Sequence, residues 1–162
     1  MPLIVDRQAQ ETHGLIIRGL RTARTEAGLS QPAAAASLPF RGRAISEWEN
    51  GLVEPKLRHL ILLADRLDLR LTLVDRYRQP VPSALWQRPG EEWVVFQRRR
   101  LATLLRHRRV ALGLATSRVG DLVGVSRDSI QRWELVRVPP RPIAHVVWAQ
   151  RLGYTLVLAS AT

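Results

Sequence analysis

The stretch RGRAISEWENG, residues 41–51, decides the fold, because much of its pattern returns in VGVSRDSIQRWE, residues 123–134. When the chain is aligned with itself at an offset of 85 residues, the coinciding residues here are Ile45, Trp48 and Glu49 with Ile130, Trp133 and Glu134. An Ile and a Trp three positions apart lie on one face of a helix. Each stretch is therefore predicted to form a short helix whose Ile and Trp face the core.

The match extends on both sides without a gap. Upstream, the coinciding residues are Leu20, Arg21, Arg24, Gly28 and Leu29 with Leu105, Arg106, Arg109, Gly113 and Leu114. Downstream, they are Val53, Pro55, Ala64, Arg66, Leu67, Leu71 and Leu73 with Val138, Pro140, Ala149, Arg151, Leu152, Leu156 and Leu158. Two Trp-Glu dipeptides in register, flanked by matching glycines and prolines, indicate a duplicated unit.

Each unit is predicted to contain four or five short helices, from apolar residues that recur every three or four positions. In the first unit these helices cover about 12–27, 30–38, about 42–50 and a segment after Pro55; the second unit begins with a helix over about 91–112 whose exposed side is basic. Gly28 is expected to end the first helix in a left-handed conformation. Ser30 and Ser126 are expected N-caps.

A short strand is predicted at the end of each unit, in 71–74 and 154–158, because both segments are rich in strand-forming residues. The two strands could pair with each other inside one chain. Prolines at 80, 82 and 89 and Gly90 predict an irregular linker. The expected organisation is therefore a domain over 10–76, a linker over 77–90 and a second domain over 91–160.

The two units resemble a known family. LRTARTEAGLSQ (20–31) followed by RGRAISEWENG, and LRHRRVALGLAT (105–116) followed by VGVSRDSIQRWE, are similar to the DNA-binding domain of the Cro/CI (XRE) helix-turn-helix family. The resemblance implies a mainly all-α fold made of two tandem lambda-repressor-like domains. It also implies that the second helix of each motif enters the major groove of double-stranded DNA.

The residues expected to contact DNA lie at the motif helices. In the first unit they are Gln31, Arg41, Gly42, Arg43, Ser46, Glu47 and Asn50. In the second they are Thr116, Ser117, Ser126, Arg127, Asp128, Gln131 and Arg132. Arginine can bind guanine, glutamine adenine and glutamate cytosine, so the two half-sites should differ in sequence.

The resemblance further implies that Gln31 contacts a phosphate and braces a recognition-helix side chain, and that Asn50 meets a phosphate. Thr116 and Leu135 stand at these positions in the second unit. Arg108 occupies a position where an apolar residue would usually pack. The basic run Arg98–Arg100, with Arg106 and Arg109, is either a solvated face or a phosphate contact.

The amino-acid composition indicates which class of molecule the chain can bind. The net charge is +11, and Lys56 is the only lysine among 25 basic residues. This charge favours polyanions, whether DNA, RNA or an anionic membrane surface. The chain has no cysteine, and its four histidines are spaced too widely for a local zinc motif, so neither metal nor cofactor is expected. The histidines are expected at the surface or partly packed.

Membrane-spanning proteins, secreted proteins and enzymes are disfavoured. The apolar runs are too short for a membrane span, no leader peptide is recognisable, and no catalytic arrangement of side chains is apparent. A cytoplasmic, nucleoid-associated, non-enzymatic protein is therefore expected, and no membrane association. The leading hypothesis is a repressor that acts by operator occupancy without a sensor domain, of phage or mobile-element type.

Two alternatives stay open at this point. The first is an antitoxin that binds its operator and a toxin, so that the protein partner would be a toxin or an anti-repressor. The second, a non-specific architectural protein, is disfavoured because Gln131 and Glu47 suit base reading. The chain could act as a monomeric pseudo-dimer or as a homodimer.

Overall fold

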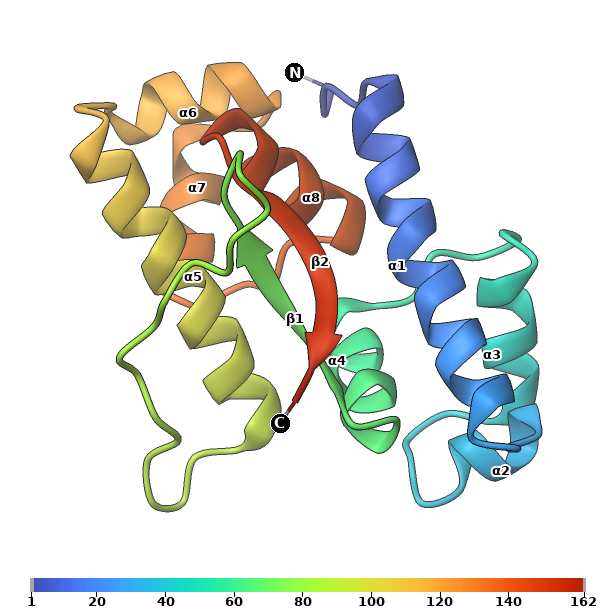
Figure 1. Cartoon of the computed structure of the whole chain (residues 1–162). Coiled ribbons are helices and arrows are strands. Elements are labelled where there is room, and N and C mark those ends of the chain that lie inside the picture. Colours follow the sequence, from blue (N-terminus) through green and yellow to red (C-terminus); the bar gives the residue numbers. More distant parts are fainter. Residues whose placement is uncertain (1, 162) are drawn as a thin grey trace.

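The computed structural model describes residues 2–161, which form a mainly helical structure with one two-stranded antiparallel sheet (Figure 1). In the first half of the chain, residues 2–76, the elements are α1 (Arg7–Glu26), α2 (Gln31–Ala35), α3 (Gly42–Glu49), α4 (Leu57–Arg66) and β1 (Leu69–Val74). In the second half, residues 77–161, they are α5 (Trp93–Ala111), α6 (Thr116–Val123), α7 (Arg127–Glu134), α8 (Pro142–Arg151) and β2 (Thr155–Ser160). The expected mainly helical class and the two strands are confirmed.

The helices of the second half follow those of the first at the spacing of the sequence repeat. α3 and α7 begin and end 85 residues apart, and so do α4 and α8. α1 and α5 end at this spacing, and α2 and α6 begin at it. The irregular segment predicted between the halves is present, because residues 75–92 contain neither a helix nor a named strand.

The three helix ends for which the sequence predicts a cap or a terminating glycine have the expected geometry. Gly28 has a φ of 69°, as expected for the residue that ends α1. The Ser30 and Ser126 hydroxyls accept hydrogen bonds from the backbone N–H groups of Ala33 and Ser129, so both predicted N-caps are confirmed.

Two predicted helix boundaries were wrong. α1 begins at Arg7 rather than near residue 12, because the Asp6 carboxylate accepts a hydrogen bond from the Ala9 N–H at 2.8 Å and caps the helix there. α2 ends at Ala35 rather than Leu38. Ala36 is extended and Ser37 has a φ of 66°, so the chain has left the helix before it reaches Pro39.

The sheet joins the last strand of the first half to the last strand of the second half. β1 and β2 pair antiparallel, with Leu71 opposite Leu158 and Val74 opposite Thr155, as expected from the two strand segments. In Figure 1 the sheet lies between α5 on one side and α1 on the other. The strands therefore connect the two halves directly.

The buried residues of both halves form one connected hydrophobic cluster. α1 contacts α8 and β2, whereas α5 contacts α4 and β1, so the first helix of each half packs on the last elements of the other half. Glu54 adds a polar link: its carboxylate pairs with Arg141 at 2.7 Å and accepts a hydrogen bond from the Ile143 N–H in the first turn of α8. The boundaries of two domains stay a prediction, because packing couples the halves.

The arginines on the basic side of α5 mostly make hydrogen bonds and ion pairs within the molecule. Arg100 is 3% exposed and donates hydrogen bonds to Gln97 and to the Leu71 carbonyl. Arg98 donates to the Val136 carbonyl, and Arg99 pairs with Glu91 at 2.8 Å. The run is therefore neither a solvated face nor a row of free cations; of the five arginines considered, Arg106 is the exposed one.

Arg108 has a structural explanation. Its Nε donates to the Leu152 carbonyl at 2.9 Å, and its guanidinium lies 5.1 Å from the centre of the Tyr154 ring. A carbonyl at the end of α8 and an aromatic face thus satisfy a charged side chain at a position where an apolar residue was expected.

His145 contradicts the expectation of surface or partly packed histidines. It is 2% exposed in α8, packs on Trp148 with ring centres 5.2 Å apart, and its Nδ1 has no hydrogen-bond partner. Burial, aided by the nearby Arg98 charge, lowers the pKa of His145 to about 4 from an ordinary value of 6.5.

Stability should therefore fall in acid. A depressed folded-state pKa makes the unfolded chain bind more protons between pH 6.5 and 4, so the contribution of neutral His145 is complete above pH 6.5 and is lost as the pH falls toward 4. The expected loss is about 3 kcal/mol of unfolding free energy. Denaturant unfolding across this pH range measures it.

The control is His145→Leu, because Leu60 is the buried residue at the corresponding position of the first half. This variant should lose most of the slope between pH 6.5 and 4. The smaller contributions of His13 and His59, whose pKa values burial also lowers, should remain. An unchanged slope in the variant would show that His145 does not cause the acid sensitivity.

Candidate nucleic-acid interface

In the first half, α2 and α3 form a close helix pair. A Cβ built on Gly42 would lie 2.7 Å from the backbone nitrogen of Pro32, so only glycine allows α2 to approach the start of α3 this closely. Gly42 was expected to face outward. Its Cα instead faces α2, and the predicted outward set on α3 reduces to Arg43, Ser46 and Glu47.

In the second half, the glycine of the helix pair lies on α6. A Cβ on Gly120 would lie 2.7 Å from the Val125 carbonyl oxygen. Arg127 occupies the position of Gly42 and its side chain is 64% exposed. The two halves thus reach close helix approach with glycine on different helices, which leaves α7 one more outward side chain than α3.

The inward faces of α3 and α7 agree with the sequence pattern. Ile45 and Ile130 are at most 1% exposed, and Trp48 and Trp133 are at most 8% exposed. The opposite faces carry the predicted polar residues; Arg43, Arg127, Asp128, Gln131 and Arg132 are exposed. Each helix therefore presents donors and acceptors on the side that does not pack.

The exposed arginines are partly paired with carboxylates. The Arg43 Nε lies 3.1 Å from a Glu47 oxygen one turn along α3, and the Arg127 Nε lies 3.9 Å from Asp128. Such exposed pairs contribute little to stability. Arg43 could therefore leave Glu47 for a base edge at small cost, and Arg127 could leave Asp128.

The strongest polar feature beside each motif is an arginine–glutamate clamp that the sequence analysis did not assign. Arg24 binds both oxygens of Glu49, at 2.7 and 3.0 Å, and donates to the Leu29 carbonyl at 2.9 Å. Arg109 does the same with Glu134, at 2.6 and 3.0 Å, and with the Leu114 carbonyl at 2.9 Å. One clamp ties α1 to the last residue of α3, and the other ties α5 to the last residue of α7.

A signal for the clamps was present in the sequence. Both arginines and both glutamates coincide in the 85-residue alignment, yet that match does not reveal that Arg24 and Glu49, 25 residues apart, face each other. The pairs are mostly buried and bidentate, with side-chain exposures of 12% and 8% in the first and 14% and 4% in the second. Bidentate geometry fixes orientation as well as distance.

Gln31 joins the first clamp. Its Nε2 donates to Glu49 at 3.0 Å, so the expected brace on a recognition-helix side chain is present. Burial opposes ionisation of Glu49, but hydrogen bonds from Arg24 and Gln31 outweigh it and hold the pKa of this carboxyl below its ordinary value. The phosphate contact of Gln31 stays a prediction.

The other predicted contacts lie at the ends of the motif helices. Asn50 is exposed after α3 and its amide donates to the Ser46 hydroxyl at 3.4 Å. Arg41 is exposed at the N-cap of α3, and Ser117 is exposed in the first turn of α6. Thr116 is half-buried and Ser126 serves as the N-cap of α7. Their contacts with DNA stay predictions.

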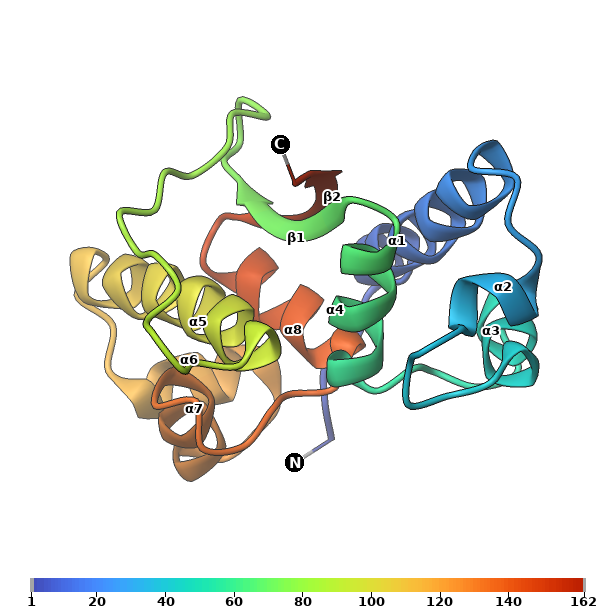
Figure 2. The same cartoon turned by 90° about the horizontal axis from the view of Figure 1, so that it is seen from below.

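The two motif helix pairs lie on one side of the molecule. Figure 2 shows α2 and α3 at one end and α6 and α7 at the other, with the sheet on the opposite side. Exposed basic side chains continue along the loops beyond α3 and α7 and into the start of α4: Lys56, Arg58, Arg137 and Arg141. Arg58 pairs with Glu92 and Arg141 with Glu54, whereas Lys56 and Arg137 add positive charge to that of the exposed arginines of α3 and α7. Positive charge on this side favours a polyanion.

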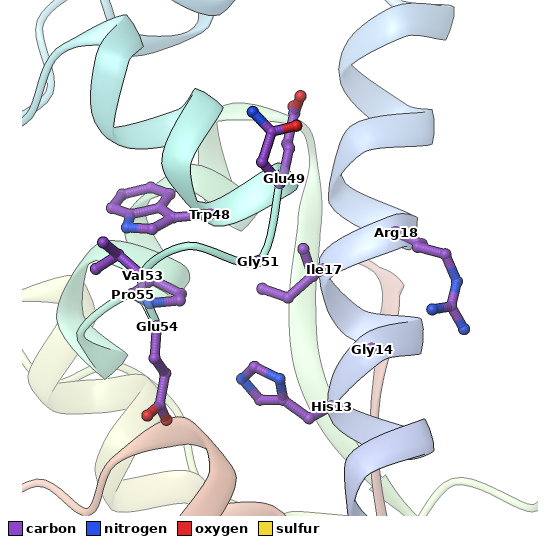
Figure 3. Close-up of a pocket in the computed structure, with 11 residues that line it drawn as sticks. His13, Gly14, Ile17, Arg18, Trp48, Glu49, Gly51, Val53, Glu54 and Pro55 are labelled. Atoms are coloured by element: carbon purple, nitrogen blue, oxygen red, sulfur yellow. The ribbon is translucent and has the colours of Figure 1, made fainter.

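A pocket of about 360 Å³ separates α1 from the loop after α3 (Figure 3). His13 points from α1 toward Glu54 across this space, and its Nε2 is buried without a partner. In the second half the corresponding residue is Arg98, which is long enough to reach the Val136 carbonyl at 3.1 Å. Because histidine is shorter than arginine, His13 does not make the corresponding hydrogen bond to the loop after α3.

Residues 20–74 match a family model described as Helix-turn-helix. The match begins within α1 and covers α2, α3, α4 and β1, and one copy is detected. It supports the resemblance to the Cro/CI (XRE) family and a DNA-binding transcription regulator. No curated protein and no solved structure gives a significant match.

Residues 2–161 contain neither a membrane-spanning helix nor a cluster of metal-ligating side chains. No helix in this range is both long and apolar enough to cross a membrane. In the same range, no three His, Cys, Asp or Glu side chains gather in an arrangement that could hold a metal ion.

Proposed function

We propose that this chain is a sequence-specific double-stranded-DNA-binding transcriptional repressor that places two helix-turn-helix motifs on one operator. α3 would read one half-site and α7 the other, and bound protein would block polymerase by occupancy. The observation that carries the proposal is the placement of both motif helix pairs on one side of a molecule whose halves share a sheet and a core.

The second motif is supported by its correspondence with the first. α3 lies within the residues that match the family model, and α7 begins and ends 85 residues after α3. The Arg109–Glu134 clamp has the same bidentate geometry as the Arg24–Glu49 clamp. The α7 sequence differs at its exposed positions. We therefore propose that one chain binds one site of imperfect inverted symmetry.

The first test concerns base reading. Replacing Arg127 or Arg132 with Ala should weaken binding to the preferred site by about 1 to 3 kcal/mol, because a bidentate arginine–guanine contact is lost. Arg43→Ala should act likewise in the first half. Fluorescence anisotropy, with a site selected from random DNA and with scrambled DNA, measures both affinities.

Arg7→Ala is the matched control, because Arg7 is 92% exposed at the start of α1 and belongs to neither motif. It should change neither affinity appreciably. If Arg127→Ala and Arg132→Ala weaken selected and scrambled DNA equally, these residues contact phosphates and the proposed reading by α7 is wrong. If no preferred site emerges from the selection, sequence-specific binding is wrong.

A further inference from the structure

The pocket between α1 and the loop after α3 has a filled counterpart in the second half. There the Arg98 side chain extends from α5 and donates a hydrogen bond to the Val136 carbonyl at 3.1 Å. In the 85-residue alignment Arg98 corresponds to His13. Val136 likewise corresponds to Gly51. The second half therefore shows that a guanidinium fits this place in the fold.

The acceptor for this guanidinium is preserved in the first half. The loops after α3 and α7 turn in the same way, because the N–H groups of Leu52 and Arg137 donate to carbonyls five positions back, each at 2.9 Å. The carbonyl of a trans peptide points opposite to its N–H, so the Gly51 and Val136 carbonyls both point away from the helix end. From residue 2 to residue 161, no N–H or O–H group donates to the Gly51 carbonyl.

Two replacements leave room beside this carbonyl. His13 is shorter than Arg98, and Gly51 has no side chain. Val136, at the position of Gly51, packs against the core. The pocket has a volume of about 360 Å³, within the range of about 300 to 1,000 Å³ that is typical of small-molecule sites. The first half thus has space for a ligand where the second half has a side chain.

Two further acceptors line the pocket. The His13 Nε2 is buried without a hydrogen-bond partner, and burial lowers the pKa of His13, so the neutral ring can accept a hydrogen bond there. Glu54 lies across the space from His13 (Figure 3). Its oxygens accept from Arg141 and from the Ile143 N–H, and a carboxylate with about four acceptor positions can accept further hydrogen bonds. The pocket therefore suits a ligand rich in donors.

We propose that this pocket binds a small molecule that carries a guanidinium group. A guanidinium has five N–H donors in one plane and no acceptor, which matches a carbonyl, an imidazole nitrogen and a carboxylate. It would donate to the Gly51 carbonyl, the His13 Nε2 and the Glu54 carboxylate. Its alkyl part would lie against Ile17 and Val53, which also line the pocket.

The first half also offers a counter-charge that the second half lacks. Burial lowers the pKa of Arg98, whose partner is a neutral carbonyl. In the first half Glu54 adds a carboxylate, where the second half has Pro139. Arg18 is the basic residue of the pocket lining, and in Figure 3 its side chain extends away from His13. A guanidinium is therefore favoured over an anionic ligand, which the Glu54 carboxylate would repel.

The test uses the full chain without DNA, so its result is separate from the proposed DNA binding. The probe is 1-propylguanidine, which reproduces the arginine side chain beyond the α-carbon, titrated against labelled protein by NMR. One molecule is expected to bind per chain, with a dissociation constant of about 1 mM or lower. The largest shifts should be at His13, Trp48 and Gly51.

Two chemical controls define what the site recognises. 1-Propylurea has the same planar shape without the charge, and it should bind at least about tenfold more weakly. The peptide acetyl-Gly-Arg-Gly-amide presents the same guanidinium on a protein backbone. It should bind no more tightly than 1-propylguanidine, because the proposed contacts are all made by the guanidinium and its alkyl part.

His13→Arg should weaken binding by about tenfold or more, because it places in the pocket the side chain that Arg98 places in the second half. Glu54→Gln should weaken binding by about fivefold or more, because the carboxylate charge is lost. Thr22→Arg is the matched control, since Thr22 is exposed on the face of α1 opposite His13 and the variant adds the same charge outside the pocket. It should bind the probe as the parent does.

The proposal is overturned if 1-propylguanidine does not approach saturation by about 10 mM, if 1-propylurea binds equally well, or if His13→Arg or Glu54→Gln binds the probe like the parent. It is also overturned if Thr22→Arg loses binding to the same extent as His13→Arg, because net charge would then explain the effect. Binding of the arginine peptide at least about tenfold tighter than the probe would assign the pocket to an arginine side chain of a partner protein instead.

Discussion

Inserting five base pairs between the two half-sites of the selected operator is expected to weaken binding by at least about 100-fold. Five base pairs rotate one half-site by about half a helical turn, to the opposite face of the duplex. A protein whose recognition helices keep a constant separation cannot then engage both. The remaining affinity would come from one motif and from non-specific phosphate contacts.

The expectation depends on how the halves are joined. β1 and β2 pair over six residues each, α1 packs on α8 and β2, and one hydrophobic cluster spans both halves. A change in the separation of α3 and α7 would break this packing. Successive major grooves lie about 34 Å apart on one face of DNA, which is the separation a pseudo-twofold molecule would need.

The matched control is an insertion of five base pairs outside the half-sites, which should leave affinity unchanged. Anisotropy or gel-shift titration of the three DNAs gives the comparison. Equal binding to the DNA with the internal insertion would mean that the halves move independently and that the linker, rather than the sheet, governs their spacing.

Glu134→Gln is expected to lower the unfolding free energy by about 3 kcal/mol, because it leaves the Arg109 charge in a mostly buried position without its counter-charge. The Arg109 and Glu134 side chains are 14% and 4% exposed and share two hydrogen bonds. Glutamine keeps the shape of glutamate, so the loss reports the charge rather than a cavity. Denaturant unfolding at neutral pH measures it, and Glu49→Gln should act in the same direction.

The control for this variant is Glu11→Gln. Glu11 pairs with Arg7 at 3.2 Å on the surface, where the two side chains are 64% and 92% exposed. Solvent screens such a pair, so the change should be close to zero. If both variants have equally small effects, the buried clamp does not stabilise the fold and its role is confined to orienting the recognition helix.

Local sequence signals predicted much of the fold. The Ile and Trp spacing predicted the inward faces of α3 and α7, Ser30 and Ser126 predicted two N-caps, and Gly28 predicted the end of α1. Side-chain periodicity and capping depend on neighbours within one helical turn, so a single sequence contains this information. Asp6 offered a similar signal for the start of α1.

The candidate interface was predicted in part. The exposed residues of α7 lie where the pattern placed them, and Gln31 donates a hydrogen bond to Glu49 at the end of α3. The predicted outward direction of Gly42 was wrong because it was inferred from the repeat position alone, whereas its contact with DNA stays a prediction. The close approach of α2 comes from packing that the periodicity of α3 does not encode.

The sequence by itself determined the repeat, the helical periodicity, the N-caps of α2 and α7, the end of α1 and the two segments that pair as strands. Only the tertiary structure decided that Arg100 is buried and Arg109 mostly buried, that Arg24 meets Glu49, and that α1 packs on α8 and β2 of the second half. The physical reason is that a charged side chain is tolerated in the interior only where a partner satisfies it. Those partners, Leu71, Glu134 and Glu49, lie 25 or more residues away along the chain and are brought near by the shared core.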